Sequence, residues 1–266
     1  MGYSAPMPPD PAIHVPVDTP LVVTRGDYRT LEFSPGDVQS EMRLSRPWAL
    51  VLAYTRAMMC FALFVPRPRH IVMVGLGGGS LAKFCYRCFP HARITVIELR
   101  ADVIALRTQF GVPLDDARFR VIHADAIDYL AATPASADVL VLDGFDAAGL
   151  PPALASSAFY GDCRRALRPG GVLVANIFNY DPAWQAMLAR LEAVFQGQLC
   201  WFDGIAGNNH VVFALHSAPP ASRARGLMRR IQRRQGHGAG CAHRALARLV
   251  VLWLAHRRVA GTPHAA

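Results

Sequence analysis

Between residues 70 and 177, short apolar runs alternate with segments whose apolar residues recur at helical spacing, and this alternation constrains the fold more than any other feature of the chain. The first run, HIVMV at residues 70–74, is apolar along most of its length, as in a strand buried on both faces of a parallel sheet. Strands separated by helices are typical of βαβ units. The sequence therefore predicts a Rossmann-like, doubly wound, mostly parallel α/β fold.

The individual elements follow from the same patterns. The expected strands are His70–Val74, Arg93–Ile97, Phe119–Ile122, Asp138–Leu142 and Val172–Ile177, with two last strands at Leu199–Asp203 and His210–Leu215. The expected helices are Trp48–Phe64, Ser80–Phe89, Ala101–Phe110, Ala126–Ala132 and Ser157–Leu167, the last one stopped by Pro169-Gly170-Gly171. Alternation from Leu21 to Phe33 around Gly26-Asp27 predicts an N-terminal β-hairpin, preceded by a proline-rich extended arm.

Charge and hydropathy restrict the partners. The net charge of +9 is densest in SRARGLMRRIQRR, residues 222–234, which lacks interleaved aromatic residues, so we expect a solvated helix face and no nucleic acid. The apolar stripe from Leu246 to Leu254 is too short to span a membrane and is expected to pack as a helix. With no signal-peptide pattern at the start, the expected location is the cytoplasm.

Cys85 and Cys88 form a Cys-x-x-Cys pair inside an expected helix. A structural zinc site normally takes a second pair of Cys or His ligands at similar spacing, and none is evident in the sequence. We therefore expect no metal.

A glycine-rich turn, Gly75-Leu-Gly77-Gly-Gly79-Ser80, follows the first strand and opens a helix. Glycines let the backbone approach a ligand closely, and the helix N-terminus offers free N–H groups. Glu98 ends the next strand, at the distance where an acidic residue commonly binds ribose hydroxyls. Together these residues predict a nucleoside site.

Two further acidic positions follow later strands. Asp125-Ala126 comes after the third strand, where a carboxylate can accept a hydrogen bond from an adenine amino group. Asp143 and Asp146 come after the fourth strand, at the edge where open α/β sheets bind ligands. Two carboxylates three residues apart can converge on a cationic amine, although Asp is also common in turns.

In order along the chain, VGLGGGSL, VIELR, HADAIDYL, DVLVLDGFD and AFYGDCRRALRPGGVLVANIF resemble the motifs of the spermidine synthase (polyamine aminopropyltransferase) family. The resemblance covers residues 21–215 and implies the class I methyltransferase fold. It also implies a homodimer, and a transfer of the aminopropyl group of decarboxylated S-adenosylmethionine to an amine such as putrescine, with release of methylthioadenosine.

The resemblance also implies roles for individual residues. Gln39 and the glycine turn would contact the nucleoside, Glu98 would hold the ribose, and Asp125-Ala126 would bracket the adenine. Asp143 would be the catalytic base and would need no large pKa shift, while Tyr54 and Asp146 would bind the amine. The expected domains are an N-terminal region at 1–66, a catalytic domain at 67–215 and an Arg-rich helical extension at 216–266.

One departure from the family pattern leaves the reaction open. Gly77 stands where the family has an aspartate that holds the aminopropyl amine. Without that carboxylate, the carboxylate of intact S-adenosylmethionine would not be repelled, so an S-adenosylmethionine-dependent methyltransferase is the alternative. A non-catalytic nucleoside-binding member of the family is a second alternative, which the retention of Asp143 and Asp146 disfavours.

Overall fold

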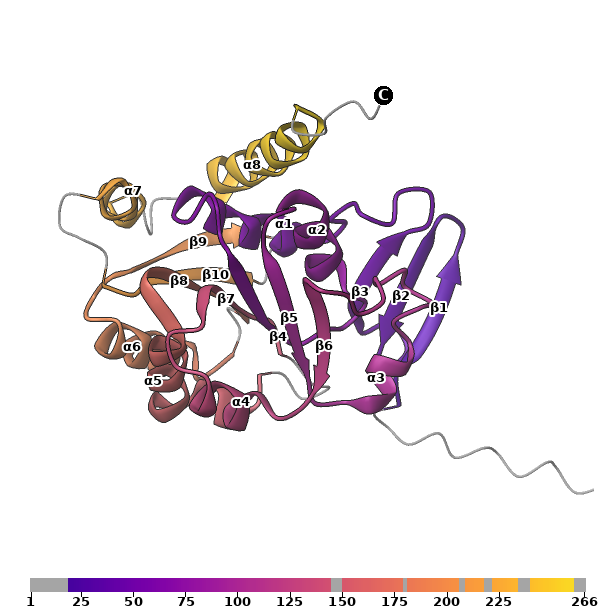
Figure 1. The fold of residues 1–266 in the computed structure, drawn as a ribbon, viewed down its shortest axis with the longest axis horizontal. Coiled ribbons are helices and arrows are strands. Elements are labelled where there is room, and N and C mark those ends of the chain that lie inside the picture. Colours follow the sequence, from indigo (N-terminus) through magenta and orange to yellow (C-terminus); the bar gives the residue numbers. More distant parts are fainter. Residues whose placement is uncertain are drawn as a thin grey trace, which may run out of the picture.

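The computed structural model describes residues 19–144, 150–178, 181–205, 209–217, 222–233 and 240–260. Its central strands are β4 (His70–Val74), β5 (Arg93–Glu98), β6 (Phe119–His123), β7 (Ala137–Leu142), β8 (Leu167–Phe178), β9 (Leu199–Ile205) and β10 (Asn209–Leu215). They form one sheet in the order β6-β5-β4-β7-β8-β10-β9 (Figure 1). Strands β4 to β8 pair in parallel, whereas β10 is antiparallel to both β8 and β9. The predicted doubly wound, mostly parallel sheet is therefore confirmed.

Helices cover both faces of this sheet (Figure 1). The helical segments are α1 (Ala53–Met58), η1 (Met59–Leu63), α2 (Ser80–Cys88), α3 (Ala101–Ala105), α4 (Ala126–Ala132), η2 (Pro152–Ala155), α5 (Ser157–Ala166), α6 (Trp184–Val194), α7 (Arg223–Gln232) and α8 (Gly240–Ala260). Alternate residues of β4 face opposite cores, with Ile71 on the side of α1, α2 and α8, and Val72 on the side of α4, α5 and α6. Burial on both faces explains why the strand is apolar throughout its centre.

The order of strands in the sheet departs from their order in the chain at β4 and β7, which are neighbours in the sheet but not consecutive in the chain. The chain first builds outward from β4 to β6 and then returns to add β7 on the other side of β4. The loops that follow β4 and β7 therefore leave the sheet in opposite directions. This place is the topological switch point of the sheet, and open α/β sheets bind ligands in the crevice that forms there.

The N-terminal hairpin is confirmed as β1 (Leu21–Arg25) and β2 (Tyr28–Glu32), and the sheet gains a third strand, β3 (Val38–Arg43). Sequence patterns did not indicate β3, because the residues on its buried face are Ser40 and Met42 rather than a row of large apolar side chains. This strand lies beside the glycine turn, where a Cβ atom built on Gly78 would lie 2.7 Å from the Ser40 hydroxyl oxygen.

Two expected helices are shorter than predicted. The first begins at Ala53 rather than Trp48, because the Arg56 guanidinium donates to the backbone carbonyls of Leu50 and Val51 and holds that stretch outside the helix. Residues 106–111 form turns rather than continuing α3, with Gly111 in a left-handed conformation.

The helix predicted at Ser157–Leu167 is confirmed as α5, which ends at Ala166, before Pro169-Gly170-Gly171. The strand after it begins earlier than the expected Val172, because these three residues lie inside β8. The backbone N–H of Gly170 donates to the carbonyl of His216, and the N–H of His216 donates to the carbonyl of Gly171. This pairing continues the antiparallel ladder with β10 beyond its last residue. Helix α6 was not expected at all.

The C-terminal helices pack on the same side of the sheet as α1 and α2. Ala247, Val250 and Leu254 of α8 are buried, which confirms the predicted packing of the apolar stripe. In α7, Met228 and Ile231 are buried whereas most arginines remain exposed, as a solvated helix face requires. Within the described residues, no helix is long and apolar enough to cross a membrane. The expected domain boundaries at residues 66 and 215 stay a proposal.

Candidate active site

The glycine turn brings the ends of β4 and β7 into close contact. Gly75 follows β4 with φ +93°, and a Cβ atom at this position would collide with the backbone carbonyl of Asp143. Its N–H donates to the carbonyl of Ile97 at 2.9 Å, and the N–H of Asp143 donates to the carbonyl of Val74 at 3.0 Å. Only glycine allows the two chain segments to approach this closely without strain. The glycine turn therefore holds Asp143 between the ends of β4 and β7, at the switch point of the sheet.

The carboxylate of Glu98 joins the end of β5 to the glycine turn. One oxygen accepts a hydrogen bond from the backbone N–H of Leu76, and the other accepts one from the N–H of Arg100, both at 2.8 Å. The side chain is only 8% exposed and lies along the cavity wall. Each carboxylate oxygen has a second lone pair, so Glu98 can still accept from a ligand hydroxyl.

Asp125 begins α4 and caps it, because its Oδ1 atom accepts a hydrogen bond from the backbone N–H of Ile127 at 2.8 Å. The neighbouring Ala126 is buried, and both residues line the cavity. The cap fixes the carboxylate in place and leaves its second oxygen for a ligand donor.

Asp143 is the centre of a chain of hydrogen bonds. Its Oδ1 atom accepts from Nδ2 of Asn176 at 3.0 Å, and its Oδ2 atom accepts from the hydroxyl of Tyr54 at 3.3 Å. Asn176 in turn accepts from Nδ2 of Asn209 at 2.9 Å. Asn209 thereby orients the Asn176 amide with its N–H group toward Asp143.

Burial raises the pKa of Asp143 to about 6, against the lowering effect of the hydrogen bonds from Asn176 and Tyr54. This differs from the expectation that its pKa needs no large shift. Burial and the neighbouring carboxylate together raise the pKa of Tyr54 well above its usual value, so its hydroxyl keeps the proton that it donates.

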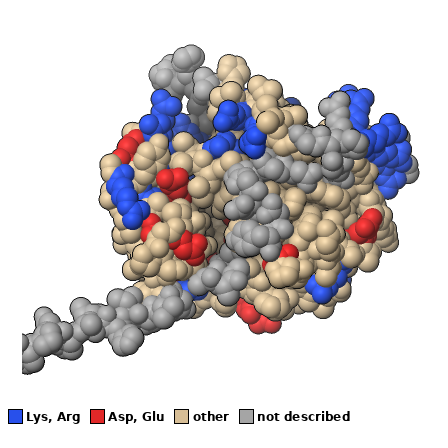
Figure 2. Space-filling view, turned by 180° about the vertical axis from the view of Figure 1, so that it is seen from behind, with Lys and Arg blue, Asp and Glu red and all other residues tan. Residues whose placement is uncertain are grey.

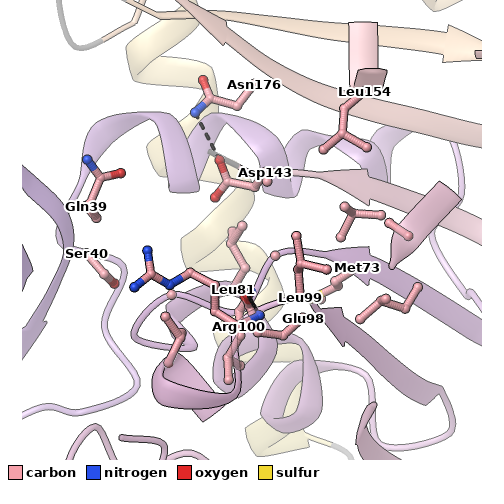
Figure 3. Close-up of a pocket in the computed structure, with 18 of the residues that line it drawn as sticks. Gln39, Ser40, Met73, Leu81, Glu98, Leu99, Arg100, Asp143, Leu154 and Asn176 are labelled. Carbon is pink, nitrogen blue, oxygen red and sulfur yellow. Dashed lines mark hydrogen bonds between the residues drawn. The ribbon is translucent and has the colours of Figure 1, made fainter. Parts of the chain in front are cut away.

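These residues line one cavity of about 480 Å³, a volume typical of small-molecule sites. Figure 3 shows Asp143 and Asn176 on one side of it, Glu98 and Arg100 on the opposite side, and Gln39 and Ser40 between them at the edge. The predicted site residues that line the cavity are Gln39, Tyr54, Gly75, Gly77, Glu98, Asp125, Ala126 and Asp143. Gly79 instead packs against Val112 at the start of α2, and Asp146 lies outside the described residues.

The charge of the cavity favours a cation. Four carboxylates among its described lining residues, those of Asp37, Glu98, Asp125 and Asp143, oppose one guanidinium, that of Arg100. Arg100 is itself paired with Asp102 at 2.7 Å and stacks over the ring of Phe33. A positively charged ligand is therefore better matched to this site than an anionic one.

Several lining residues were missed from the sequence, namely Ser40, Arg100, Asn176 and Asn209. The one available signal was that Asn176 interrupts an apolar run, VLVANIF, in an expected buried strand. A buried polar side chain normally has a hydrogen-bond partner, which here is the catalytic candidate Asp143.

The Cys85 and Cys88 pair lies buried in α2, away from this cavity, and burial raises the pKa of the Cys85 thiol. No group of three or more His, Cys, Asp or Glu residues within the described ranges is arranged to hold a metal ion.

Comparisons with known proteins agree with this geometry. Residues 51–195 match the model of the spermine/spermidine synthase domain. The polyamine aminopropyltransferase of Chromobacterium violaceum is 35% identical over 212 residues, which cover 79% of this chain and 81% of that protein.

Among solved structures, a probable spermidine synthase from Corynebacterium glutamicum is 22% identical with a TM-score of 0.66, and the match covers 79% of this chain and 82% of that one. Human methyltransferase-like protein 13, solved with SAH, is 26% identical with a TM-score of 0.53, over 68% of this chain and 90% of that one. Both likenesses agree with the predicted class I methyltransferase fold.

Proposed function

Since the chain belongs to the spermine/spermidine synthase family, we propose that it is an aminopropyltransferase. It moves the aminopropyl group of decarboxylated S-adenosylmethionine to an amine acceptor such as putrescine and releases methylthioadenosine. The observation that carries this proposal is the carboxylate of Asp143, which is buried at the switch point of the sheet and held by Tyr54 and Asn176.

In the proposed reaction, the lone pair of the acceptor nitrogen attacks the methylene carbon of the aminopropyl group next to the sulfonium. A carbon–nitrogen bond forms, the carbon–sulfur bond breaks, and the electron pair of that bond goes to the sulfur of methylthioadenosine. The nitrogen gives up a proton to Asp143. The sulfonium is already an activated leaving group, so positioning the two reactants supplies most of the rate.

The raised pKa of Asp143 suits this role. A base whose pKa lies near the operating pH is ionised and still has a useful proton affinity. With a pKa of about 6, Asp143 is mostly ionised at neutral pH and binds a proton more readily than an ordinary aspartate does. The hydrogen bonds from Asn176 and Tyr54 keep both of its oxygens in a fixed orientation.

The opposite side of the cavity binds the nucleoside in this proposal. Glu98 accepts hydrogen bonds from the ribose hydroxyls, and Asp125 accepts one from the adenine amino group. Gln39 from β3 closes the cavity beside them, where its Nε2 atom donates to Asp37 at 2.9 Å. Tyr54 binds the amine beside Asp143 in this proposal, and Asp146 is assigned the same role on the family resemblance alone.

A methyltransferase that uses intact S-adenosylmethionine is the second candidate, and one observation favours it. Gly77 lines the cavity, and the nearest atom to a Cβ built there is the Cβ of Ser40, at 3.8 Å. The wall therefore carries no side chain at this point, and nothing at position 77 repels the carboxylate of the intact cofactor. The likeness to human methyltransferase-like protein 13 points the same way.

One assay separates the candidates. Purified protein is incubated with decarboxylated S-adenosylmethionine and putrescine, or with S-adenosylmethionine and the same acceptor, and methylthioadenosine and S-adenosylhomocysteine are quantified by mass spectrometry. Release of methylthioadenosine that depends on both substrates supports aminopropyl transfer, while S-adenosylhomocysteine would identify a methyltransferase. Nucleoside binding without either product would favour the non-catalytic alternative.

The cytoplasmic location and the homodimer are also part of the proposal. Sedimentation equilibrium of the purified chain tests the homodimer, and fractionation of cells that express it tests the location.

A further inference from the structure

The net positive charge of the protein comes from the last part of the chain. Residues 216–266 contain ten arginines and neither Asp nor Glu, whereas residues 1–215 contain 18 Lys or Arg and 19 Asp or Glu. The net charge is thus +10 after residue 215 and −1 before it, which together give the total of +9. In Figure 2 a dense group of Lys and Arg lies at the upper right, on the side of α7, while further Lys, Arg, Asp and Glu are spread over the rest of this face.

Helix α8 also exposes an apolar stripe. Its inner face carries the buried Ala247, Val250 and Leu254, and the face opposite carries Leu249 and Leu252, which are 63% and 65% exposed. These two leucines are separated by about one helical turn and lie side by side on the surface. Isolated exposed leucines are common, but a stripe of them on one helix face indicates a contact surface.

Basic residues flank this stripe on both sides. Trp253 is 41% exposed, and the Arg257 guanidinium lies over its ring at 4.7 Å from the centroid. On the other flank, Arg248 is exposed and lies near Arg56, whose pKa is lowered first by burial and second by the charge of Arg248. Helix α7, which packs against the same strand β9 as α8, adds the exposed arginines Arg223, Arg229 and Arg230.

We infer that the outward faces of α7 and α8, here called the tail surface, bind the surface of an anionic lipid bilayer. An apolar stripe of Leu and Trp between arginines is the arrangement by which interfacial helices lie in the headgroup region. Arginines in such a helix keep their charged ends at the phosphates while their stems cover apolar surface. The inference is independent of the proposed function.

Two other occupants fit the tail surface less well. A symmetric contact with a second copy would place the same arginine-rich patch against itself, and these like charges would have no acidic residue between them. A nucleic acid would meet the arginines, but the leucines at the centre neither neutralise phosphate nor stack on bases.

Co-sedimentation of the full-length protein with vesicles tests the inference. One set of vesicles is phosphatidylcholine alone, and in the other about a third of the lipid is phosphatidylglycerol, which supplies a negative surface. We expect binding to the anionic vesicles only, weakened by high salt. The double variant Leu249→Glu, Leu252→Glu should lower the apparent affinity by about tenfold or more, and Arg230→Glu by about fivefold or more.

Matched controls carry the same substitutions elsewhere. Leu114→Glu changes a leucine that is 74% exposed, and Arg120→Glu changes an exposed arginine on β6. Both should bind anionic vesicles within about twofold of the parent. All variants should retain the parent's far-ultraviolet circular dichroism spectrum and cooperative thermal unfolding, which report that the protein is folded.

Three results would overturn the inference. The first is no binding to anionic vesicles, or equal binding by the tail-surface variants and their controls. The second is a dimer of the parent that becomes monomeric in the double leucine variant, with no vesicle binding, which would assign the stripe to a second copy. The third is binding of duplex RNA or DNA that needs Arg230 but not Leu249 or Leu252, without vesicle binding.

Discussion

The Nδ2 atom of Asn176 donates a hydrogen bond to Oδ1 of Asp143 at 3.0 Å, which links β8 to the loop that follows its neighbour β7. The amide cannot turn over without losing the hydrogen bond that it accepts from Asn209. Asn176 therefore presents a donor to Asp143 and favours the ionised carboxylate.

Removing this donor should move the pH dependence of the reaction. Asn176→Leu keeps the approximate size but removes the hydrogen bond that lowers the pKa of Asp143, so that pKa should rise above about 6. Because the base must be ionised, the acid limb of the kcat profile should move to higher pH by about one unit, the size expected for a hydrogen bond to a charged group. Tyr54→Phe removes the second donor and should move the limb in the same direction. An unchanged limb in both variants would show that Asp143 does not control it.

Asp143 should also affect stability in a pH-dependent way. Its pKa is raised from 3.8 to about 6 on folding, so between these values the folded protein holds the proton more tightly than the unfolded chain does. The contribution of Asp143 is therefore most favourable below pH 4 and is lost as the pH rises through 6.

In Asp143→Asn this loss cannot occur. The free energy of unfolding of the variant minus that of the parent should therefore be more positive at pH 7 than at pH 4, by up to about 3 kcal/mol. Urea denaturation of both proteins at the two pH values measures the difference. If the gap between them is the same at both pH values, the raised pKa is not a property of the folded state.

The nucleoside side of the cavity can be tested without an acceptor. Glu98→Gln retains one acceptor oxygen but removes the charge, and the binding of methylthioadenosine should weaken by about 1.5–3 kcal/mol. Calorimetry measures this directly. Glu192→Gln makes the same change at an exposed position of α6 and should leave the affinity unaltered. Equal affinities of the two variants would exclude Glu98 as a nucleoside ligand.

Gly77 should set the preference between the two donors. Gly77→Asp places a carboxylate on the cavity wall, where Ser40 is the nearest of the described residues. Asp tolerates the left-handed backbone of this residue, at φ +50°, better than most residues do. The variant should bind decarboxylated S-adenosylmethionine more tightly relative to intact S-adenosylmethionine than the parent does, by about tenfold for a close charge pair. Gly77→Asn has the same shape without the charge and controls for strain. No difference between the two variants would mean that residue 77 does not face this end of the donor.

Much of the site could be predicted because parallel strands end at a shared edge. Gly75, Glu98, Asp125 and Asp143 each follow a recognisable apolar strand, so their placement needs no knowledge of which strands are neighbours. The apolar runs of these strands are short but distinct, and their predicted bounds are close to those observed.

The remaining residues depend on information that local patterns do not contain. Asn209 meets Asn176 only because β10 inserts antiparallel between β8 and β9, a pairing that no local motif specifies. Ser40 reaches the glycine turn through β3, whose buried face is not apolar enough to be recognised. The early start of the predicted helix at Trp48 failed for a different, local reason, since the hydrogen bonds from Arg56 to the carbonyls of Leu50 and Val51 outweigh helical spacing.

The central claim is that Asp143 takes the proton from the attacking amine, and a single comparison tests it. Asp143→Asn keeps the size of the side chain and one acceptor oxygen, but it replaces the other oxygen with an amide donor and removes the charge and the basicity. With decarboxylated S-adenosylmethionine and a working acceptor, kcat for methylthioadenosine release should fall by about 10²–10⁴-fold, while the affinity for methylthioadenosine stays nearly unchanged. Full turnover by Asp143→Asn would contradict the account.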